Sequence, residues 1–271
     1  MTADQRTPVT LPRLHWGAPD ASRRALLVHG LGSSAATMWQ LGEGLAAAGW
    51  SATAIDLRGH GTAPRTSTYR IDDLAADLLA TRPADSGQAG PLHADGAWDA
   101  VLGHSIGGAA AIVAAAIAPD WARRLVLLDP AVRADVELRQ TILANQLTAH
   151  DGATIASVAE QNPQWHATTV ELRVQAVRQA SRFALEHAVL DNPEWDVTSE
   201  AERLTTPTLV IAGEVARGGM FAGDHGDALL AANRHLRAVV VAGGHNAHRD
   251  VPEVVLEHAL AFIDGRSRGQ G

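Results

Sequence analysis

Six short runs of β-prone residues punctuate this chain, and most of them are apolar along their whole length. They lie at residues 25–28, 51–55, 100–102, 125–128, 208–211 and 238–241. A strand that is apolar on both faces is buried on both faces, which is typical of a parallel sheet covered by helices. Helical patterns separate the runs, at residues 35–48, 71–80, 106–118 and 251–263. The alternation predicts an α/β fold with a mostly parallel, doubly wound sheet and helices on both faces.

One interval breaks this alternation. Residues 131–206 contain about four helical patterns and no convincing strand, with helices expected at residues 138–147, 155–161 and 168–187. We therefore predict a helical cap, residues 131–206, inserted into a core domain formed by residues 1–130 and 207–271. The proline- and glycine-rich segment 82–96 predicts an exposed loop.

Composition excludes several classes of protein. With 271 residues, 46% of them hydrophobic and 19% charged, the chain can bury a large core. A formal net charge of -8 without a basic patch argues against a nucleic-acid partner. Residues 1–13 lack the apolar run of a signal peptide, and the longest apolar stretch, residues 109–118, is too short to span a bilayer. We expect a cytoplasmic protein without a membrane partner, and the sequence leaves its oligomeric state open.

The strongest chemical signal is GHSIGG at residues 103–108, a G-x-S-x-G pattern between an apolar run and the helix expected from Ile106. A strand that turns sharply into a helix holds its central residue in a strained conformation, and flanking glycines let the backbones approach closely. This turn would present Ser105 as a nucleophile at the edge of the sheet. The Ile106 N–H, at the helix start, is expected to stabilise the oxyanion that forms after attack.

With three further motifs, this turn resembles the α/β-hydrolase fold family, in the subgroup with an inserted cap, from about residue 25 to residue 263. HGLGS at residues 29–33 resembles the family's oxyanion loop, which implies that the Leu31 N–H is the second oxyanion donor and that Gly30 adjoins the substrate. DLRGHG at residues 56–61 resembles a turn that shapes the rim of the site without taking part in proton transfer. GGHNAHRD at residues 243–250 resembles the catalytic histidine loop and implies that His245 is the base.

An imidazole suits this role because its pKa lies near neutrality. A metal site at His245 and His248 is the alternative that their spacing allows. The chain has neither an HExxH pattern nor a cysteine ligand, so we expect no metal and no cofactor. We expect His248 to be a loop residue with local hydrogen bonds and His104 to pack beneath the nucleophile.

The acid of the triad departs from the family pattern. Most members carry an aspartate three residues after the glycine that ends the seventh strand, and here that position is Ala216. Asp129 is the preferred replacement, because it follows the run at residues 125–128 and lies at the same edge of the sheet as Ser105. Some relatives, including zearalenone lactonases and pancreatic lipases, take their acid from this position.

Three alternatives to this assignment stay open. Glu214 directly follows the strand at residues 208–211 and its glycine, and Asp224 lies further along the same irregular segment. The other interpretation of Asp129 is a carboxylate that caps the turn at Pro130.

The function expected from these residues is hydrolysis of a small-molecule carboxylic ester or lactone through an acyl-enzyme on Ser105. We expect Trp165 and Trp195 of the cap to line a pocket that prefers a moderately apolar acyl or lactone group. The alternatives are a carbon-carbon bond hydrolase, a lyase or an acyltransferase on the same triad, or a catalytically weak ligand-binding member. A serine at the turn excludes the relatives that attack with a carboxylate, such as haloalkane dehalogenases.

Overall fold

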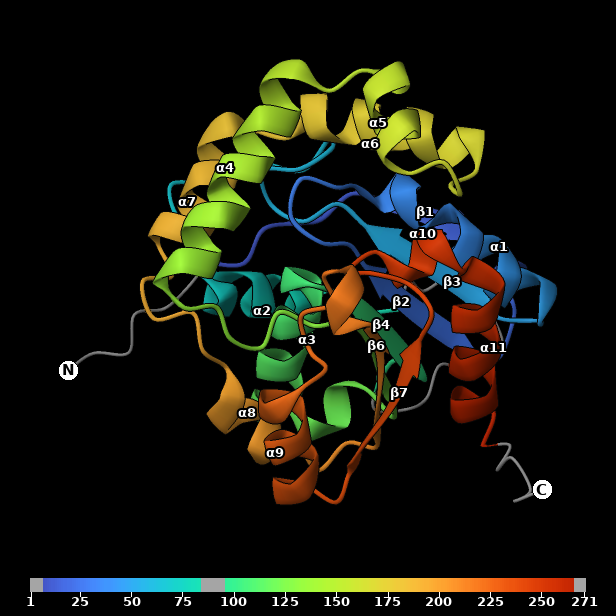
Figure 1. The fold of residues 1–271 in the computed structure, drawn as a ribbon. Helices are drawn as coiled ribbons and strands as arrows, with labels where there is room; N and C mark the ends of the chain where they lie inside the picture. Colours follow the sequence, from blue (N-terminus) through green and yellow to red (C-terminus); the bar gives the residue numbers. More distant parts are fainter. Residues whose placement is uncertain (1–6, 84–95, 266–271) are drawn as a thin grey trace.

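The computed structural model describes residues 7–83 and 96–265, and these residues form a seven-stranded sheet between helices (Figure 1). The strands are arranged in the order β1 (Arg13–Trp16), β3 (Ser51–Ile55), β2 (Arg24–Val28), β4 (Ala100–His104), β5 (Leu125–Leu128), β6 (Thr208–Gly213) and β7 (Leu236–Val241). β1 runs antiparallel to β3, and the other neighbouring strands pair in parallel. The predicted fold class is confirmed.

Alternate residues of the buried strands face opposite layers of helices. In β2, Leu27 packs in one apolar cluster with α1 (Trp39–Ala47) and α11 (Pro252–Ile263). Its neighbour Leu26 packs in the other cluster with α2 (Ile71–Ala80) and α3 (Ile106–Ile117). Apolar contact on both sides is the reason that these strands read as unbroken apolar runs.

The sequence prediction misses β1. This strand lies at the edge of the sheet, and its side chains are exposed or half-buried. An edge strand of this kind has no need of a continuous apolar run, so it gives no signal of the type that identifies the other strands. Most of the predicted loop at residues 82–96 lies outside the described residues.

The segment between β5 and β6 is helical. It contains α4 (Val136–Gly152), α5 (Ile155–Gln161), α6 (Ala167–Gln179), α7 (Arg182–Leu190) and α8 (Thr198–Glu202). Helices α4 and α6 pass over the edge of the sheet where the parallel strands end (Figure 1). Side chains from both helices line one cavity with Ser105. No helix of the described residues is both long and apolar enough to cross a bilayer.

The prediction of one helix over residues 168–187 is wrong. The chain leaves the helix at Ala180, and α7 begins after Ser181. The Ser181 N–H donates to the Gly59 carbonyl at 2.7 Å, and the Ser181 hydroxyl caps α7 by accepting the Ala184 N–H. The helical pattern of the sequence continues through residues 168–187, but the contact of Ser181 with the turn at residues 56–61 separates them into two helices.

A buried ion pair holds the turn at residues 56–61 against α2. Arg58 donates to both carboxylate oxygens of Asp77, at 2.7 and 2.8 Å. Arg58 also donates to the carbonyls of Thr68 and Asp73, and Asp77 accepts the Val9 N–H. The bidentate geometry and these further bonds satisfy both charged groups inside the protein.

We expect Asp77→Asn to lower the free energy of unfolding by about 3–5 kcal/mol, because the amide leaves the Arg58 charge buried without its partner. Denaturant titration measures the change. Asp20→Asn, in an exposed turn, is the matched control and should alter stability by less than about 0.5 kcal/mol. Equal stability of the two variants would show that the buried pair contributes nothing.

Candidate active site

Ser105 occupies a strained turn between β4 and α3, with φ 53° and ψ −123°. Residues other than glycine rarely adopt a positive φ. The turn is possible because glycines allow close approach: a Cβ on Gly103 would lie 2.9 Å from the Gly107 carbonyl oxygen. A Cβ on Gly107 would lie 2.4 Å from the His29 carbonyl oxygen. The strain at Ser105 is thus fixed by the packing of α3 against β4 and the loop after β2.

The structure brings Ser105, His245 and Asp129 together from the loops after β4, β7 and β5. His245 Nε2 lies 3.0 Å from Ser105 Oγ, and His245 Nδ1 lies 2.6 Å from Asp129 Oδ2. The His245 side chain is 27% exposed and the Asp129 side chain is 2% exposed. Solvent therefore reaches the imidazole, whereas the carboxylate lies behind it.

Backbone N–H groups hold the Asp129 carboxylate. Oδ1 accepts from Gly213 at 3.2 Å and from Phe221 at 3.3 Å, and Oδ2 accepts from Met220 at 2.8 Å. Asp129 has φ 40°. Among the described residues, Ser105 and Asp129 are the only ones other than glycine that have a positive φ. These contacts direct the carboxylate toward His245 and fix its orientation.

Neither alternative acid contacts the imidazole. Glu214 pairs with Arg217 at 2.7 Å and is partly exposed. Asp224 is exposed in the first turn of α9 (Asp224–Ala232). The loop after β6 therefore contributes backbone N–H groups that bind Asp129, whereas the carboxylates of Glu214 and Asp224 do not contact the imidazole.

Two backbone donors beside Ser105 are unengaged. Neither the Leu31 N–H nor the Ile106 N–H donates a hydrogen bond to another described residue. Ile106 is the first residue of α3, where N–H groups have no acceptor within the helix. Leu31 lines the same cavity as Ser105. Both N–H groups are available to an oxygen bound next to the serine.

The loop that carries Leu31 is cross-linked to the turn at residues 56–61. His60 Nε2 accepts the Gly32 N–H at 3.1 Å, and His29 Nε2 accepts the Leu57 N–H at 3.0 Å. Both imidazoles accept hydrogen bonds because they are neutral. Burial lowers the pKa of His60, and burial together with the nearby His60 lowers the pKa of His29 to about 3.

His104 and His248 form a buried pair beside His245. Their ring centroids lie 4.3 Å apart, and His104 Nε2 donates to the His245 carbonyl at 2.9 Å. The expectation of local hydrogen bonds for His248 is wrong: it lies in α10 (Ala247–Asp250), and neither ring nitrogen has a partner among the described residues. Burial lowers the pKa of both side chains well below the ordinary value. The described residues contain no cluster of three potential metal ligands.

Ser105 opens into a cavity of about 160 Å³. Its wall is formed by Leu31, Ser33, His104, Ser105, Ile142, Asn145, Gln146, Arg173, Met220, His245, Asn246 and Arg249. The wall contains two arginines and three amide side chains beside its apolar residues, and the expected preference for an apolar group stays a prediction. Sequence reasoning missed both arginines.

None of the three predicted substrate-binding residues, Gly30, Trp165 and Trp195, lines this cavity. Trp195 is 2% exposed and belongs to the main core, where its indole N–H donates to the Ala131 carbonyl at 2.8 Å. Gly30 packs against the His104 ring, because a Cβ at this position would lie 2.6 Å from His104 Nδ1. Both positions are explained by packing.

Trp165 lies in an adjoining cavity of about 610 Å³, which shares Asn145, Arg173 and Asn246 with the first. Its indole N–H donates to Asp250 at 2.7 Å. The side chain is therefore placed beside the cavity that contains Ser105 and outside its wall.

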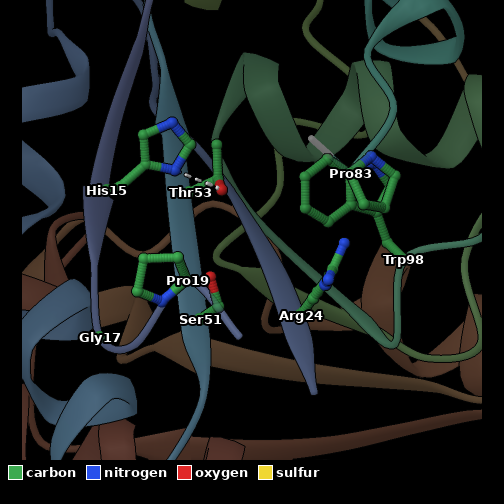
Figure 2. A pocket seen from close by; sticks show the side chains of 8 residues that line it. All are labelled: His15, Gly17, Pro19, Arg24, Ser51, Thr53, Pro83 and Trp98. Carbon is green, nitrogen blue, oxygen red and sulfur yellow. Dashed lines mark hydrogen bonds between the residues drawn. The ribbon is translucent and has the colours of Figure 1, made fainter. Parts of the chain in front are cut away.

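A separate cavity of about 260 Å³ lies near the amino-terminal ends of β2 and β3 (Figure 2). It is lined by His15, Gly17, Pro19, Arg24, Ser51, Thr53, Pro83 and Trp98. Figure 2 shows the hydrogen bond between the His15 ring and the Thr53 hydroxyl. His15 Nδ1 and Thr53 Oγ1 are 3.0 Å apart. These lining residues include no carboxylate, so this cavity lacks the acid and base pair found beside Ser105.

Comparison with known proteins relates the whole arrangement to one family. A model described as "Alpha/beta hydrolase family" matches residues 25–258. Lipase LipV of Mycobacterium tuberculosis is 33% identical over 133 residues, which are 49% of this chain and 47% of the lipase. Pimeloyl-[acyl-carrier protein] methyl ester esterase of Neisseria meningitidis serogroup A is 36% identical over 112 residues, or 40% of this chain and 30% of the esterase. The chain thus spans less than half the length of these relatives.

A solved structure extends the likeness over nearly the whole fold. The crystal structure of E-2-(acetamidomethylene)succinate hydrolase superposes with a TM-score of 0.75 at 23% identity, covering 94% of this chain and 96% of that chain. At this level of identity the likeness concerns the fold.

Buried neutral histidines make stability depend on pH. The pKa values of His29, His60, His104 and His248 lie below the ordinary 6.5 in the folded chain. Below pH 6.5 the unfolded chain binds protons that the folded chain does not, so stability is present above this pH and is lost as the pH falls. We expect each histidine to remove up to about 1.4 kcal/mol per pH unit.

Unfolding free energies at pH 7.5 and pH 5 measure this loss. His248→Leu should reduce the decrease in unfolding free energy between these pH values by the contribution of one histidine, because leucine binds no proton in the folded or the unfolded chain. A loss that is identical in the wild type and in this variant would contradict the interpretation.

Proposed function

The chain belongs to the alpha/beta hydrolase family, and from this premise we propose that it is a serine hydrolase that cleaves a small-molecule carboxylic ester or lactone. The observation that carries the proposal is the hydrogen-bonded row of Ser105 Oγ, His245 and Asp129 at the wall of a cavity. The lipase and the methyl ester esterase among the partial relatives support the ester class. A lactone is an internal ester, so the same attack opens it.

In the proposed first step, His245 Nε2 removes the Ser105 proton while the oxygen attacks the substrate carbonyl. Asp129 keeps the proton on Nδ1, which leaves Nε2 as the acceptor, and stabilises the imidazolium that forms. The N–H groups of Leu31 and Ile106 bind the oxyanion. Proton transfer from His245 to the leaving alcohol oxygen then gives the acyl-enzyme.

In the second step, His245 activates a water that attacks the acyl carbon, and Ser105 leaves with its proton restored. The partly exposed imidazole gives water access to this position. His104 and His248 do not compete for the proton, because burial keeps both neutral.

In this proposal, residues 131–206 act as a cap on the core formed by residues 1–130 and 207–271. Helices α4 and α6 supply Ile142, Asn145, Gln146 and Arg173 to the cavity. The hydrolytic residues come from the loops of the sheet, and much of the surrounding wall comes from the inserted helices. Specificity would then depend on the insertion and chemistry on the core.

A fluorophosphonate should label Ser105 and inactivate the protein, because the probe forms a stable adduct with a serine that a neighbouring base activates. Peptide mass spectrometry locates the adduct. Ser105→Ala should abolish labelling, and Ser199→Ala, at an exposed helix position, should label like the wild type. An adduct at another residue, or none, would refute the proposed nucleophile.

Asp129→Asn should lower kcat by roughly 10³–10⁴-fold with little change in KM, because the amide favours the wrong imidazole tautomer and does not stabilise the cation. Glu214→Gln removes one of the two alternative acids and should change kcat by less than about threefold, because Glu214 forms an exposed ion pair with Arg217 and does not contact the imidazole. Steady-state kinetics on p-nitrophenyl esters measure both. The reverse ranking would assign the role to Glu214.

A further inference from the structure

Two guanidinium groups line the Ser105 cavity without an ion pair to any described carboxylate. Arg173, on α6, donates from Nη1 to the Gly32 carbonyl. Arg249, on α10, donates from Nη2 to the Ser33 hydroxyl at 2.9 Å and to the Thr37 hydroxyl at 3.4 Å. The Nε of Arg249 is buried and has no partner among the described residues. The Arg249 guanidinium also lies over the Trp165 ring, 5.3 Å from its centroid. These neutral partners satisfy only part of the hydrogen-bonding capacity and charge of the two cations.

Two carboxylates near the cavity, those of Asp250 and Asp129, are engaged by other donors. Asp250 attracts Arg249 electrostatically, but its oxygens accept from the side chains of Gln164 and Trp165 and from the Gly244 N–H. Asp129 accepts from the imidazole and from three backbone N–H groups. Neither acid therefore neutralises a guanidinium at contact distance.

Placing the buried Arg249 and the half-buried Arg173 in one wall is unfavourable without an anion. Burial and the nearby Arg173 lower the pKa of Arg249 to about 9, and burial lowers the pKa of Arg173 to about 10. Both side chains remain charged at neutral pH. A buried cation that lacks an ionic partner is rare in proteins unless a ligand supplies the opposite charge.

The arginines are anchored directly beside the expected oxyanion donors. Arg173 and Arg249 bind Gly32 and Ser33, the two residues that follow Leu31. An anion held between them lies on the same side of the cavity as the carbonyl that Ser105 attacks. This cavity of about 160 Å³ adjoins the cavity of about 610 Å³, and Arg173 lines both, so there is room for an anionic group together with the ester group to which it is attached.

We propose that Arg173 and Arg249 hold a carboxylate of the substrate, so that the protein hydrolyses half-esters of short dicarboxylic acids or lactones that carry a free carboxylate. The inference rests on the proposed function and specifies its substrate class. A planar carboxylate accepts two hydrogen bonds from a guanidinium fork, and arginine binds it more specifically than lysine does. Gln146 Oε1 also lacks a partner in this wall, and a 180° rotation of the amide would offer an N–H group to the same anion.

Binding is tested without turnover in Ser105→Ala, by calorimetric titration with glutarate and with its neutral diamide, glutaramide. We expect saturable binding of glutarate, and binding of glutaramide at least tenfold weaker. Arg173→Met and Arg249→Met should each weaken glutarate binding at least tenfold, whereas Arg203→Met, at an exposed position, should not change it. Arg249→Lys keeps the buried charge and replaces Arg249→Met if that variant fails to fold; it should weaken binding by a smaller factor.

Turnover is tested with monoethyl glutarate and ethyl valerate, which differ by a carboxylate in place of a methyl group. Wild-type kcat/KM should favour the monoethyl glutarate at least thirtyfold. This ratio should fall toward one in Arg173→Met and Arg249→Met, even though loss of the Gly32 and Ser33 contacts lowers both rates.

Two results would overturn the inference: no saturable binding of glutarate to Ser105→Ala, or equal turnover of the two esters by a wild type that is labelled at Ser105. Binding of inorganic phosphate without binding of glutarate would show that the class of anion is wrong. Failure of the proposed function has a different signature. Glutarate would then bind in an arginine-dependent manner, while Ser105 stays unlabelled and neither ester is hydrolysed.

Discussion

The close approach of α3 to β4 is the constraint on which the site depends. Gly103, Gly107 and Gly108 each lie where a Cβ would meet another backbone or Pro130 at 3.0 Å or less. This contact holds Ser105 at a positive φ and brings the first turn of α3 against the loop after β2. Ser105, the Ile106 N–H and the loop that carries the Leu31 N–H are therefore positioned by one packing arrangement. A larger side chain at any of these glycines would displace all three together.

The sequence predicts those features that depend on local pattern. Unbroken apolar runs identify the parallel strands, and the turn at Ser105 is identifiable because its glycines are required by sterics. Asp129 could be ranked first because its strand ends at the same edge of the sheet as Ser105 and because some relatives take their acid from this position. The structure places β5 directly beside β4. What the sequence does not show is how the loop after β6, which lacks an acid at Ala216, donates the Met220 and Phe221 N–H groups to Asp129. Almost every residue carries a backbone N–H, so the residue type does not show which N–H groups bind Asp129.

Contacts between distant segments that match no sequence motif could not be predicted. Arg173 and Arg249 lie in separate helices, and each reads in the sequence as an ordinary solvated charge. Trp165 and Trp195 were expected to line the pocket because of their apolar faces, but neither lines the Ser105 cavity. Tryptophan is as well suited to a core as to a ligand site, and Trp195 packs in the core beneath the inserted helices. Only the packing of α6 and α10 around one cavity shows that its wall is cationic.

Unfavourable features accumulate at this one place in the molecule. Ser105 and Asp129 hold positive φ angles, which cost about 1–3 kcal/mol each. His248 has two unpaired ring nitrogens, and Arg249 is buried without a carboxylate at contact distance. Selection for stability alone would remove such features, because neutral or apolar substitutes of similar size would avoid the cost. Their concentration around a single small cavity, while the ion pair of Arg58 is fully matched elsewhere, indicates that the cavity is built for a ligand whose charge and shape offset the strain.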